Sequence, residues 1–353
     1  MKPFLEVKNL SVAFPTEDGL VQATDEVSFS VDLGQTLAIV GESGSGKSVS
    51  SMAIMGLHNP KRTRISGEVI FNLDSGPVDV ISSDEETVRK MRGKSMAMVF
   101  QDPMSSLHPY YTINNQISEA WLLHNKGSKA DARKRSLEML DLVGIPDPHK
   151  RIDEYPHQFS GGMRQRVMIA MSLVNNPKLL IADEPTTALD VTVQSEILAL
   201  IQKMQKEFNT AVILITHDMG VVAEVADRIN VMYAGRLVEQ GAVDEIFYRP
   251  VHPYTVGLLG SIPRVDEKHG SRLKTINGQP PSLIGLPAGC AFASRCEFAS
   301  HVSGNLCATT RPETQEKMPD HFARCHLTAA QVQQISSSKK VGQLPGYKKS
   351  IFY

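Results

Sequence analysis

The eight residues at 41–48, GESGSGKS, constrain the fold of this chain more than any other stretch. They match the phosphate-loop pattern, in which glycines let backbone N–H groups close on phosphate oxygens. A continuous apolar run at 36–42 precedes the loop, as a buried parallel strand does, and residues 48–57 follow it with helical spacing. Strand, glycine-rich loop and helix in this order predict a layered α/β fold that binds a nucleotide.

The remainder of the first 250 residues alternates between strand and helix patterns. The apolar runs predict further buried strands at 96–103, 179–183 and 211–218, and helical spacing recurs at 113–125, 129–144, 163–174 and 191–208. Alternating segments at 5–14 and 27–34 indicate antiparallel strands, and residues 229–241 predict a hairpin that turns at Ala234–Gly235.

These patterns predict several structural units. We expect a nucleotide-binding core with a β subdomain from residues 1–100 and 176–250, and a helical subdomain from 101–175. After residue 250, repeated prolines predict an irregular, loop-rich extension over 251–330, followed by a flexible polar tail over 331–353.

The composition limits the ligands and the cellular locations that we expect for this protein. Its 37 Lys and Arg residues balance 38 Asp and Glu residues, so no global basic field favours nucleic acid. No apolar run approaches the roughly 18–20 residues of a membrane span, and the start MKPFLEVKNL lacks the apolar core of a signal peptide. We therefore expect a cytosolic protein, or one peripheral to a membrane.

The phosphate loop assigns the first site residues. Lys47 is expected to reach the β- and γ-phosphates, and the Ser48 hydroxyl to ligate Mg²⁺. The backbone of the loop is expected to bind ATP through Gly41, Ser43, Gly44, Ser45 and Gly46.

Two carboxylates end the buried strand LLIAD. Asp183 is placed to hold Mg²⁺, directly or through water, and Glu184 is the candidate general base or water-positioning group for attack on the γ-phosphate. His217 follows the next apolar strand and is expected to face the γ-phosphate. Gln101 ends MAMVFQ, where its amide can ligand Mg²⁺ or hold the attacking water. Phe14 ends the first strand and either stacks on adenine or belongs to the core.

A second phosphate-binding signal lies at FSGGMRQR, residues 159–166. Ser160, Gly161 and Gly162 open directly into a helical run, and free N–H groups at a helix N-terminus attract anions. Two phosphate-gripping loops in one chain predict that they serve different nucleotides or different subunits.

Together these motifs resemble the ATP-binding subunit of ABC transporters over roughly residues 4–250. GESGSGKS, Gln101, FSGGM, LLIADEP, TALD (187–190) and His217 occur in the order and at the spacings of that family, with Phe159 and Met163 at the variable ends of its LSGGQ signature. The resemblance implies a RecA-like core and a head-to-tail pair of subunits. In that pair Ser160, Gly161 and Gly162 would grip the γ-phosphate of ATP bound to the partner, and Asp190 would lie across the dimer seam.

The C-terminal segment narrows the resemblance. HPYTVGLLGSIPR (252–264) and residues 272–296 look like the extension of oligopeptide/dipeptide importer ATPases, and YPHQFSGGMRQRVMIAM looks most like their "D" subunit. The resemblance implies an ATPase on the cytoplasmic face of the bacterial inner membrane, a homologous partner ATPase, two permease subunits and an extracytoplasmic peptide-binding protein. Related importers carry nickel, glutathione or antimicrobial peptides. A soluble ABC ATPase acting on ribosomes or DNA, or an unrelated phosphate-loop kinase or GTPase, fits the motifs less well.

All four cysteines of the chain lie between residues 290 and 325. Cys290, Cys296, Cys307 and Cys325 have the spacing C-x5-C-x10-C-x17-C, and four thiolates suit zinc or an iron–sulfur cluster. The absence of C-x2-C knuckles favours a cluster, and the importer resemblance implies a [4Fe–4S] cluster. His301, His321 and His326 lie near enough in sequence to be alternative ligands, which keeps Zn²⁺ open. Four free thiols are the remaining interpretation.

Overall fold

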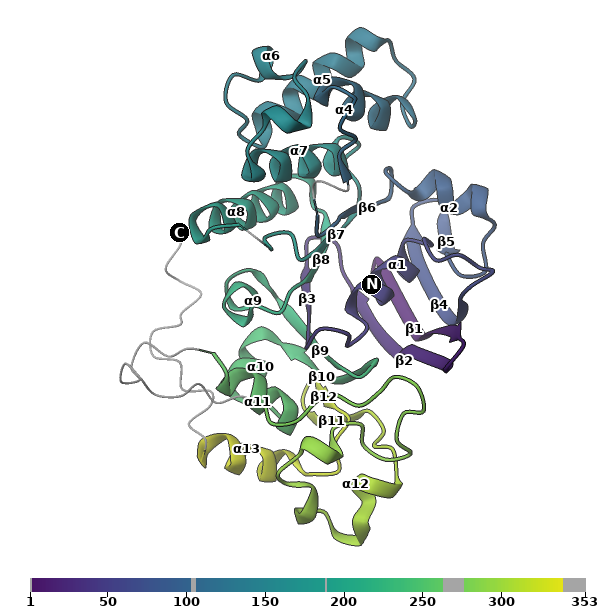
Figure 1. Cartoon of the computed structure of the whole chain (residues 1–353), viewed down its shortest axis with the longest axis vertical. Helices are drawn as coiled ribbons and strands as arrows, with labels where there is room; N and C mark the ends of the chain where they lie inside the picture. Colours follow the sequence, from purple (N-terminus) through teal and green to yellow (C-terminus); the bar gives the residue numbers. More distant parts are fainter. Residues whose placement is uncertain (1, 103–105, 188, 263–275, 339–353) are drawn as a thin grey trace.

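The computed structural model describes residues 2–102, 106–187, 189–262 and 276–338. An eight-stranded sheet runs through its centre, and a four-stranded sheet lies beside it (Figure 1). In sheet order, the eight strands are β11 (Gln315–Met318), β12 (His321–Ala323), β10 (Arg236–Ala242), β9 (Arg228–Tyr233), β3 (Thr36–Val40), β8 (Ala211–Ile215), β7 (Leu179–Asp183) and β6 (Met96–Val99).

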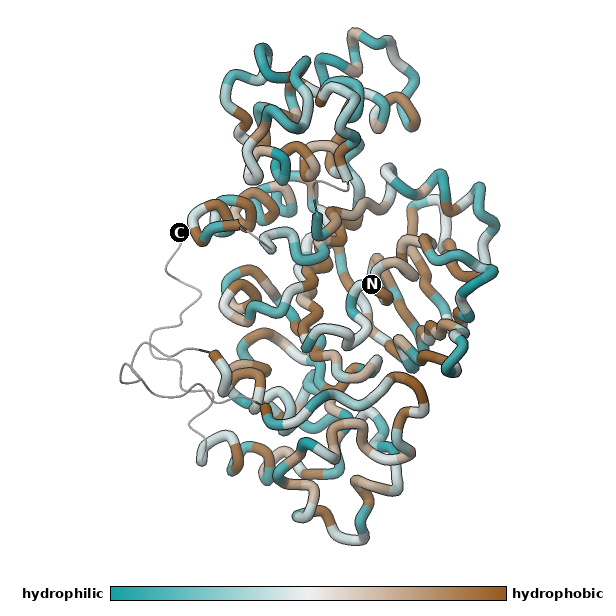
Figure 2. Tube along the Cα trace, viewed as in Figure 1, coloured by the Kyte–Doolittle hydropathy of each residue, from teal (hydrophilic) through white to brown (hydrophobic). Residues whose placement is uncertain are grey.

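The five strands β9, β3, β8, β7 and β6 are parallel, and the predicted buried strands are confirmed within them. Successive side chains of β3 enter different cores: Leu37 and Ile39 pack toward the four-stranded sheet, while Ala38 and Val40 pack toward α9 (Met219–Val225). Both faces of the strand are therefore covered, which explains its continuous apolar sequence. Figure 2 shows the hydrophobic residues concentrated along these central strands.

The four-stranded sheet is antiparallel in the order β2 (Gly19–Val31), β1 (Leu5–Thr16), β4 (Arg64–Leu73) and β5 (Gly76–Asp79). Helix α1 (Lys47–Ile54) lies between this sheet and the central one, and α2 (Glu85–Met91) follows β5 (Figure 1). The apolar side chains of both sheets form one core around Ile54. This arrangement brings the end of β1 close to the phosphate loop.

A helical block projects beyond the β6 edge of the central sheet (Figure 1). It contains α4 (Ile113–Leu122), α5 (Lys129–Leu142), α6 (Pro148–Arg151), the 3₁₀ turn η1 (Pro156–Gln158) and α7 (Gly161–Leu173), and α8 (Val191–Phe208) packs against the same core. The predicted helices between residues 112 and 175 are thus confirmed.

The predicted hairpin joins β9 to β10 with its turn at Ala234–Gly235. Both residues have positive φ, 46° and 79°, which is the backbone form of a tight two-residue hairpin turn. Helix α10 (Val243–Tyr248) follows β10 and packs on α9. Within the described residues, no helix combines the length and apolar character needed to cross a bilayer.

The extension after residue 250 is more regular than predicted. It begins with α11 (Pro253–Gly260) and contributes β11 and β12, which lengthen the central sheet by pairing beside β10. Between α11 and β11 the chain forms four short helical turns: η2 (Ala293–Arg295), η3 (Ala299–His301), η4 (Ser303–Asn305) and α12 (Leu306–Thr309). The strands were missed because their stabilising partner, Glu239 of β10, is distant in sequence: its Oε1 lies 2.7 Å from Nε2 of the fully buried His321.

Part of the expected flexible tail is also ordered. Residues 331–338 belong to α13 (Ala329–Ser338), whose Val332 and Ile335 are buried against the core around α11. These two apolar side chains, one turn apart, dock this short helix, and Gln333 Nε2 also lies 3.1 Å from Met318 Sδ. Residues 339–353 of the expected tail lie outside the described residues.

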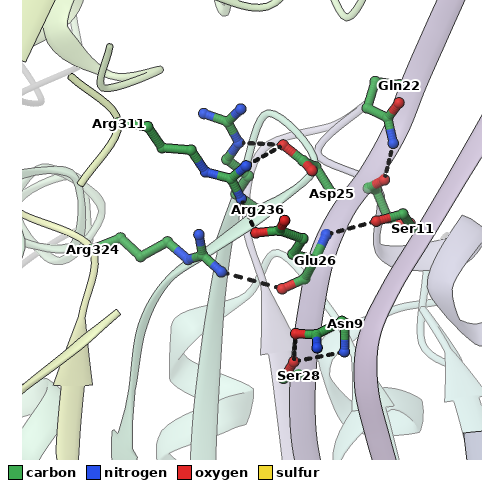
Figure 3. A network of polar contacts seen from close by, with 10 residues as sticks. Asn9, Ser11, Gln22, Asp25, Glu26, Ser28, Arg236, Arg311 and Arg324 are labelled. Carbon is green, nitrogen blue, oxygen red and sulfur yellow. Dashed lines mark hydrogen bonds and ion pairs between the residues drawn. The ribbon is translucent and has the colours of Figure 1, made fainter. Parts of the chain in front are cut away.

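Arginines of the extension meet carboxylates of the four-stranded sheet in the network of Figure 3. Arg311 contacts Asp25 Oδ2 at 3.2 Å and Glu26 Oε2 at 2.8 Å, and Arg324 donates to the Glu26 carbonyl at 3.2 Å. Arg236 of β10 donates to the same Asp25 oxygen at 2.8 Å. The extension therefore bridges the two sheets.

Candidate nucleotide site

The predicted nucleotide residues meet at one edge of the central sheet. The strands β3, β8, β7 and β6 are neighbours in that order and parallel, so their carboxyl ends lie side by side. Each is followed by a motif residue, and a cavity of about 780 Å³ opens there. Its lining residues are Phe14, Val21, Ala23, Ser43, Gly44, Ser45, Gly46, Lys47, Ser48, Val49, Gln101, Glu184, His217 and Leu283.

The conformation of the phosphate loop requires its glycines. Gly41 and Gly46 have positive φ, 153° and 101°, which L side chains rarely adopt. A Cβ on Gly41 would also lie 2.2 Å from the Met232 carbonyl oxygen, and one on Gly46 would lie 2.4 Å from the Ala23 oxygen. Packing against β9 and β2 thus fixes the loop before any phosphate binds.

Lys47 opens α1 and is nearly buried. Its Nζ donates to the carbonyl oxygens of Gly41 at 2.8 Å and Glu42 at 3.0 Å. Burial lowers the pKa of this ammonium, while Glu184 and Asp183 oppose the effect. In this structure the Lys47 ammonium is bound by two neutral carbonyl oxygens, and phosphate oxygens can take their place as acceptors.

Asp183 lies at the end of β7 with its side chain almost enclosed. Burial raises the pKa of this carboxyl, and a hydrogen bond from Ser48 opposes the rise. Its Oδ1 is buried and has no hydrogen-bond partner in the described part of the chain. An orphaned carboxylate oxygen beside a hydroxyl is the oxygen-rich donor set that Mg²⁺ prefers, so these two residues fit the ion.

The Glu184 carboxylate is the centre of a polar cluster. Gln101 Nε2 donates to Oε2 at 3.1 Å, and His217 Nδ1 lies 3.3 Å from Oε1. Thr187 Oγ1 also donates to Oε2 at 2.9 Å. Glu184 itself has a φ of 46°, a region that non-glycine residues seldom occupy. This backbone form turns the carboxylate out of the strand toward the cavity.

Sequence reasoning missed Thr187. Its signal was its position three residues after the carboxylate within a turn, where the Thr187 backbone N–H also bonds the Glu184 carbonyl at 3.1 Å. Leu283 was missed as well, because it comes from the extension: its carbonyl oxygen accepts from Gln22 N at 2.9 Å, which places it beside β2 at the cavity.

Phe14 lies where the prediction placed it, at the end of β1 and on the wall of the cavity. Its ring meets the His58 ring edge-on at a centroid distance of 5.6 Å and packs partly against the core. One face of the ring is thus supported from within the protein, which leaves the cavity side for an apolar or aromatic group of a ligand.

The Ser160–Gly162 turn does not line this cavity in the described structure. Ser160 caps α7 by accepting from Met163 N at 3.3 Å, and Asp190 caps α8 by accepting from Val193 N at 3.0 Å. A Cβ on Gly162 would lie 2.8 Å from Val193, whereas a Cβ on Gly161 would meet no atom within 4 Å. Within the described residues, no neighbouring atom therefore requires position 161 to lack a side chain.

The four cysteines come together from separate loops. Cys290, Cys296, Cys307 and Cys325 line one small enclosed cavity with Phe292 and His326. Burial raises the pKa of Cys290 to about 11 and that of Cys325 to about 12, so both are neutral thiols without a ligand. In the part of the chain that is described, no group of three or more His, Cys, Asp or Glu side chains is arranged to hold a metal ion.

The three histidines considered as alternative ligands separate in the structure. His326 lines the cysteine cavity, where its Nε2 lies 2.8 Å from the Thr310 carbonyl oxygen. His321 is instead paired with Glu239 in the sheet, and His301 packs edge-on against the Phe298 ring. Among the described residues, neither His321 nor His301 lines the cysteine cavity, so of these three histidines only His326 is brought to the four thiols.

Two family descriptions match different parts of this chain. Residues 24–187 match "ABC transporter", and residues 238–302 match "Oligopeptide/dipeptide transporter, C-terminal region". The first range contains the phosphate loop, the Ser160–Gly162 turn and both strand-end carboxylates. The second contains α11 and the first two cysteines.

Curated relatives match along nearly the whole chain. The dipeptide transport ATP-binding protein DppD of Bacillus subtilis is 50% identical over 93% of this chain and 95% of its own length. The oligopeptide transport ATP-binding protein OppD of Escherichia coli is 48% identical over 91% and 92%. Among solved structures, the dimeric ATP-binding cassette MJ0796, in a post-hydrolysis state bound to ADP and Pi, has a TM-score of 0.60 at 29% identity and covers 68% of this chain and 98% of its own. This chain belongs to the ATP-binding proteins of the oligopeptide and dipeptide branch of ABC transporters.

Proposed function

We propose that this chain is the ATP-hydrolysing subunit of an importer that moves dipeptides or oligopeptides across the cytoplasmic membrane. The observation that carries the proposal is the Glu184 carboxylate, held by Gln101, Thr187 and His217 over the cavity of a complete phosphate loop. The printed functions of DppD and OppD support a peptide cargo. Nickel, glutathione or antimicrobial peptides are the alternative cargoes.

Different residues of the cavity perform different steps of ATP hydrolysis. Lys47 leaves the carbonyl oxygens of Gly41 and Glu42 and binds the β- and γ-phosphates, while the loop backbone surrounds them. Glu184 accepts a proton from, or orients, the water that attacks the γ-phosphate, and His217 holds that carboxylate in place. Phe14 supports the adenine.

Mg²⁺ supplies charge neutralisation on the phosphates when it is bound. Ser48 and Asp183 would hold the ion, with Gln101 at the edge of its site. The support is the orphaned Asp183 oxygen and the Ser48 hydrogen bond to that carboxyl. Gln101 has a second task in the same place, because its amide already donates to Glu184.

The ATP site of this chain is one half of a composite site. Ser160, Gly161 and Gly162 would bind the γ-phosphate held by a homologous ATP-binding partner, and Asp190 would lie at the seam. Support comes from Gly161, where a Cβ would meet no atom of the described residues within 4 Å, and from the dimeric cassette that this fold resembles. Two permease subunits and an extracytoplasmic peptide-binding protein complete the importer, with this chain peripheral on the cytoplasmic face of the inner membrane.

We assign these tasks to the units expected from the sequence. Residues 1–100 and 176–250 form the nucleotide core, 101–175 form the helical unit, and the segment from 251 carries the cysteine site. We propose that Cys290, Cys296, Cys307 and Cys325 take up an iron–sulfur cluster, because all four line one cavity. The described side chains are not arranged as a metal site, so the thiols must move toward one another to hold the cluster. Anaerobic purification with iron, sulfide and zinc assays tests this: stoichiometric zinc without iron would reject the cluster.

Peptide uptake by a strain that lacks this subunit tests the function. Restoring the wild-type chain should restore growth on an essential amino acid supplied as a dipeptide or tripeptide, and Lys47→Met should not, because its phosphate loop lacks the cation. Lys206→Met on α8 is the control. Uptake unaffected by Lys47→Met, or recovery of the chain with ribosomes and without a permease, would reject the proposal.

A further inference from the structure

Glu42 belongs to the phosphate loop but is held from outside it. Its Oε2 accepts from Arg295 Nη1 at 2.9 Å, and its backbone N–H donates to the Tyr254 hydroxyl at 3.0 Å. Its carbonyl oxygen accepts from Lys47 Nζ at 3.0 Å. Both Arg295 and Tyr254 come from the C-terminal extension, so that segment holds the side chain and the main chain of a loop residue.

Arg295 is itself fixed on every side. Only 5% of its side chain is exposed. Its Nε donates to the Asn277 carbonyl at 2.9 Å and its Nη2 to the Ile276 carbonyl at 3.2 Å. The guanidinium carbon lies 5.7 Å from the centre of the Tyr233 ring. A buried charge with this many partners has one orientation, and it transmits the position of its backbone to Glu42.

Arg295 lies in the turn η2, between Ala293 and Cys296, which both line the cysteine cavity. The turn η2 is closed by hydrogen bonds from Ala293 N to the Cys290 carbonyl at 3.0 Å and from Cys296 N to the Ala293 carbonyl at 3.3 Å. Cys290 and Cys296 flank Arg295 and line the cavity with Ala293. Whatever holds or releases these thiols therefore changes the turn that carries Arg295.

We propose that Arg295 is a positioning residue for the phosphate loop and that it links ATP binding to the state of the four-cysteine cavity. The inference rests on the proposed nucleotide site and adds a regulatory connection to it. Coupling between two sites is reciprocal. Fixing the turn η2 and its flanking thiols therefore strengthens ATP binding, and bound ATP favours the fixed form of that turn by the same factor. The connection runs through one ion pair, from Arg295 to Glu42.

A purely structural role for Arg295 makes a different prediction. In that case the ion pair only docks the extension on the cassette, and removing any other docking arginine has a similar result. Arg311 is the matched control, because it docks the extension through ion pairs to Asp25 and Glu26, which lie on β2 and outside the phosphate loop (Figure 3). Comparing the two arginines therefore separates positioning from docking.

The first experiment measures the dissociation constants of ATP and of tripolyphosphate, a probe without a base, on the full chain by calorimetry. Arg295→Met should weaken both about tenfold, because a charge-assisted hydrogen bond that orders the loop is lost. Arg295→Lys should recover part of the loss, since it keeps the charge without the planar fork. Arg311→Met should leave both constants within about twofold of wild type.

Three results would overturn the proposal. Arg295→Met could leave both constants unchanged, Arg311→Met could weaken them equally, or Arg295→Met could weaken ATP and not tripolyphosphate, which would place the effect at the base side near Leu283. Lys47→Met separates these results from a failure of the nucleotide site itself: wild-type protein that binds ATP no better than Lys47→Met has no such site.

The second experiment measures the cysteine side of the connection. Alkylation of Cys290 and Cys296 is followed by mass spectrometry with and without saturating ATP, on the protein as purified. ATP should slow the reaction about threefold in wild type, by local ordering, and have no effect in Arg295→Met. An ATP effect that is absent in wild type, or that persists in Arg295→Met, would contradict the connection.

Discussion

The nucleotide edge of the central sheet and the cysteine cavity of the extension are built in different ways. At the nucleotide edge, four neighbouring strands end together, and Lys47, Asp183, Glu184 and His217 follow from that geometry. At the cysteine cavity, the thiols come from short turns and loops, and Cys325 alone follows closely on a strand, β12. The first site is shaped by the fold, whereas the second depends on contacts between segments. Substitutions at the nucleotide edge should therefore lower ATP turnover. Substitutions at the cysteine cavity should lower the free energy of unfolding or weaken the link between the cavity and ATP binding.

The largest effect is expected from Glu184→Gln. Turnover of ATP should fall about a thousandfold, because an amide accepts a proton poorly, while the ATP dissociation constant stays within about twofold. Steady-state phosphate release and equilibrium binding measure the two quantities. Thr187→Val, which removes one donor to the carboxylate, should cost about tenfold in turnover. Near-normal hydrolysis by Glu184→Gln would remove this residue as the base.

A smaller effect, on stability instead of turnover, is expected where the extension joins the sheet. Glu239→Ala leaves buried His321 and the Val251 N–H without their acceptor, and should lower the free energy of unfolding by about 3 kcal/mol. Urea unfolding measures it. Gln240→Ala, next along β10, removes only an exposed hydrogen bond to the Ser28 carbonyl and is the control. Equal losses in both variants would show that the buried pair contributes nothing special.

The smallest effect concerns Asp320, in the turn between β11 and β12. Arg228 donates to this carboxyl and holds its pKa below the usual range. Because the folded pKa lies below the unfolded one, the pair stabilises the protein at neutral pH and loses this contribution as the pH falls through the lowered value. Asp320→Asn should cost well under about 1 kcal/mol at pH 7, since the carboxylate is exposed. The difference between the two proteins should shrink as the pH falls below about 3.9, the ordinary pKa of Asp; a constant difference would contradict this.

The two regions also differ in how far the sequence predicted them. The nucleotide residues were predictable because motif spacing and strand-end position place them, and neighbouring parallel strands then bring them together. Thr187 and Leu283 were not, since Thr187 acts through a local turn and Leu283 lies 261 residues after Gln22, its hydrogen-bond partner beside the cavity. The ordered part of the extension depends on pairs such as His321 with Glu239 and Arg295 with Glu42, which lie 82 and 253 residues apart. A pattern of neighbouring residues in the sequence cannot predict partners so far apart.

The most direct test of the central claim, a nucleotide site completed by a second subunit, uses Gly161. In the Glu184→Gln background, sedimentation velocity should show ATP-driven pairing of this chain with its homologous partner. Adding Gly161→Glu should abolish pairing while the chain's own ATP affinity stays within about twofold, because a Cβ at this position meets no atom of the described residues within 4 Å. Pairing that survives Gly161→Glu, or that needs no ATP, would contradict the composite site.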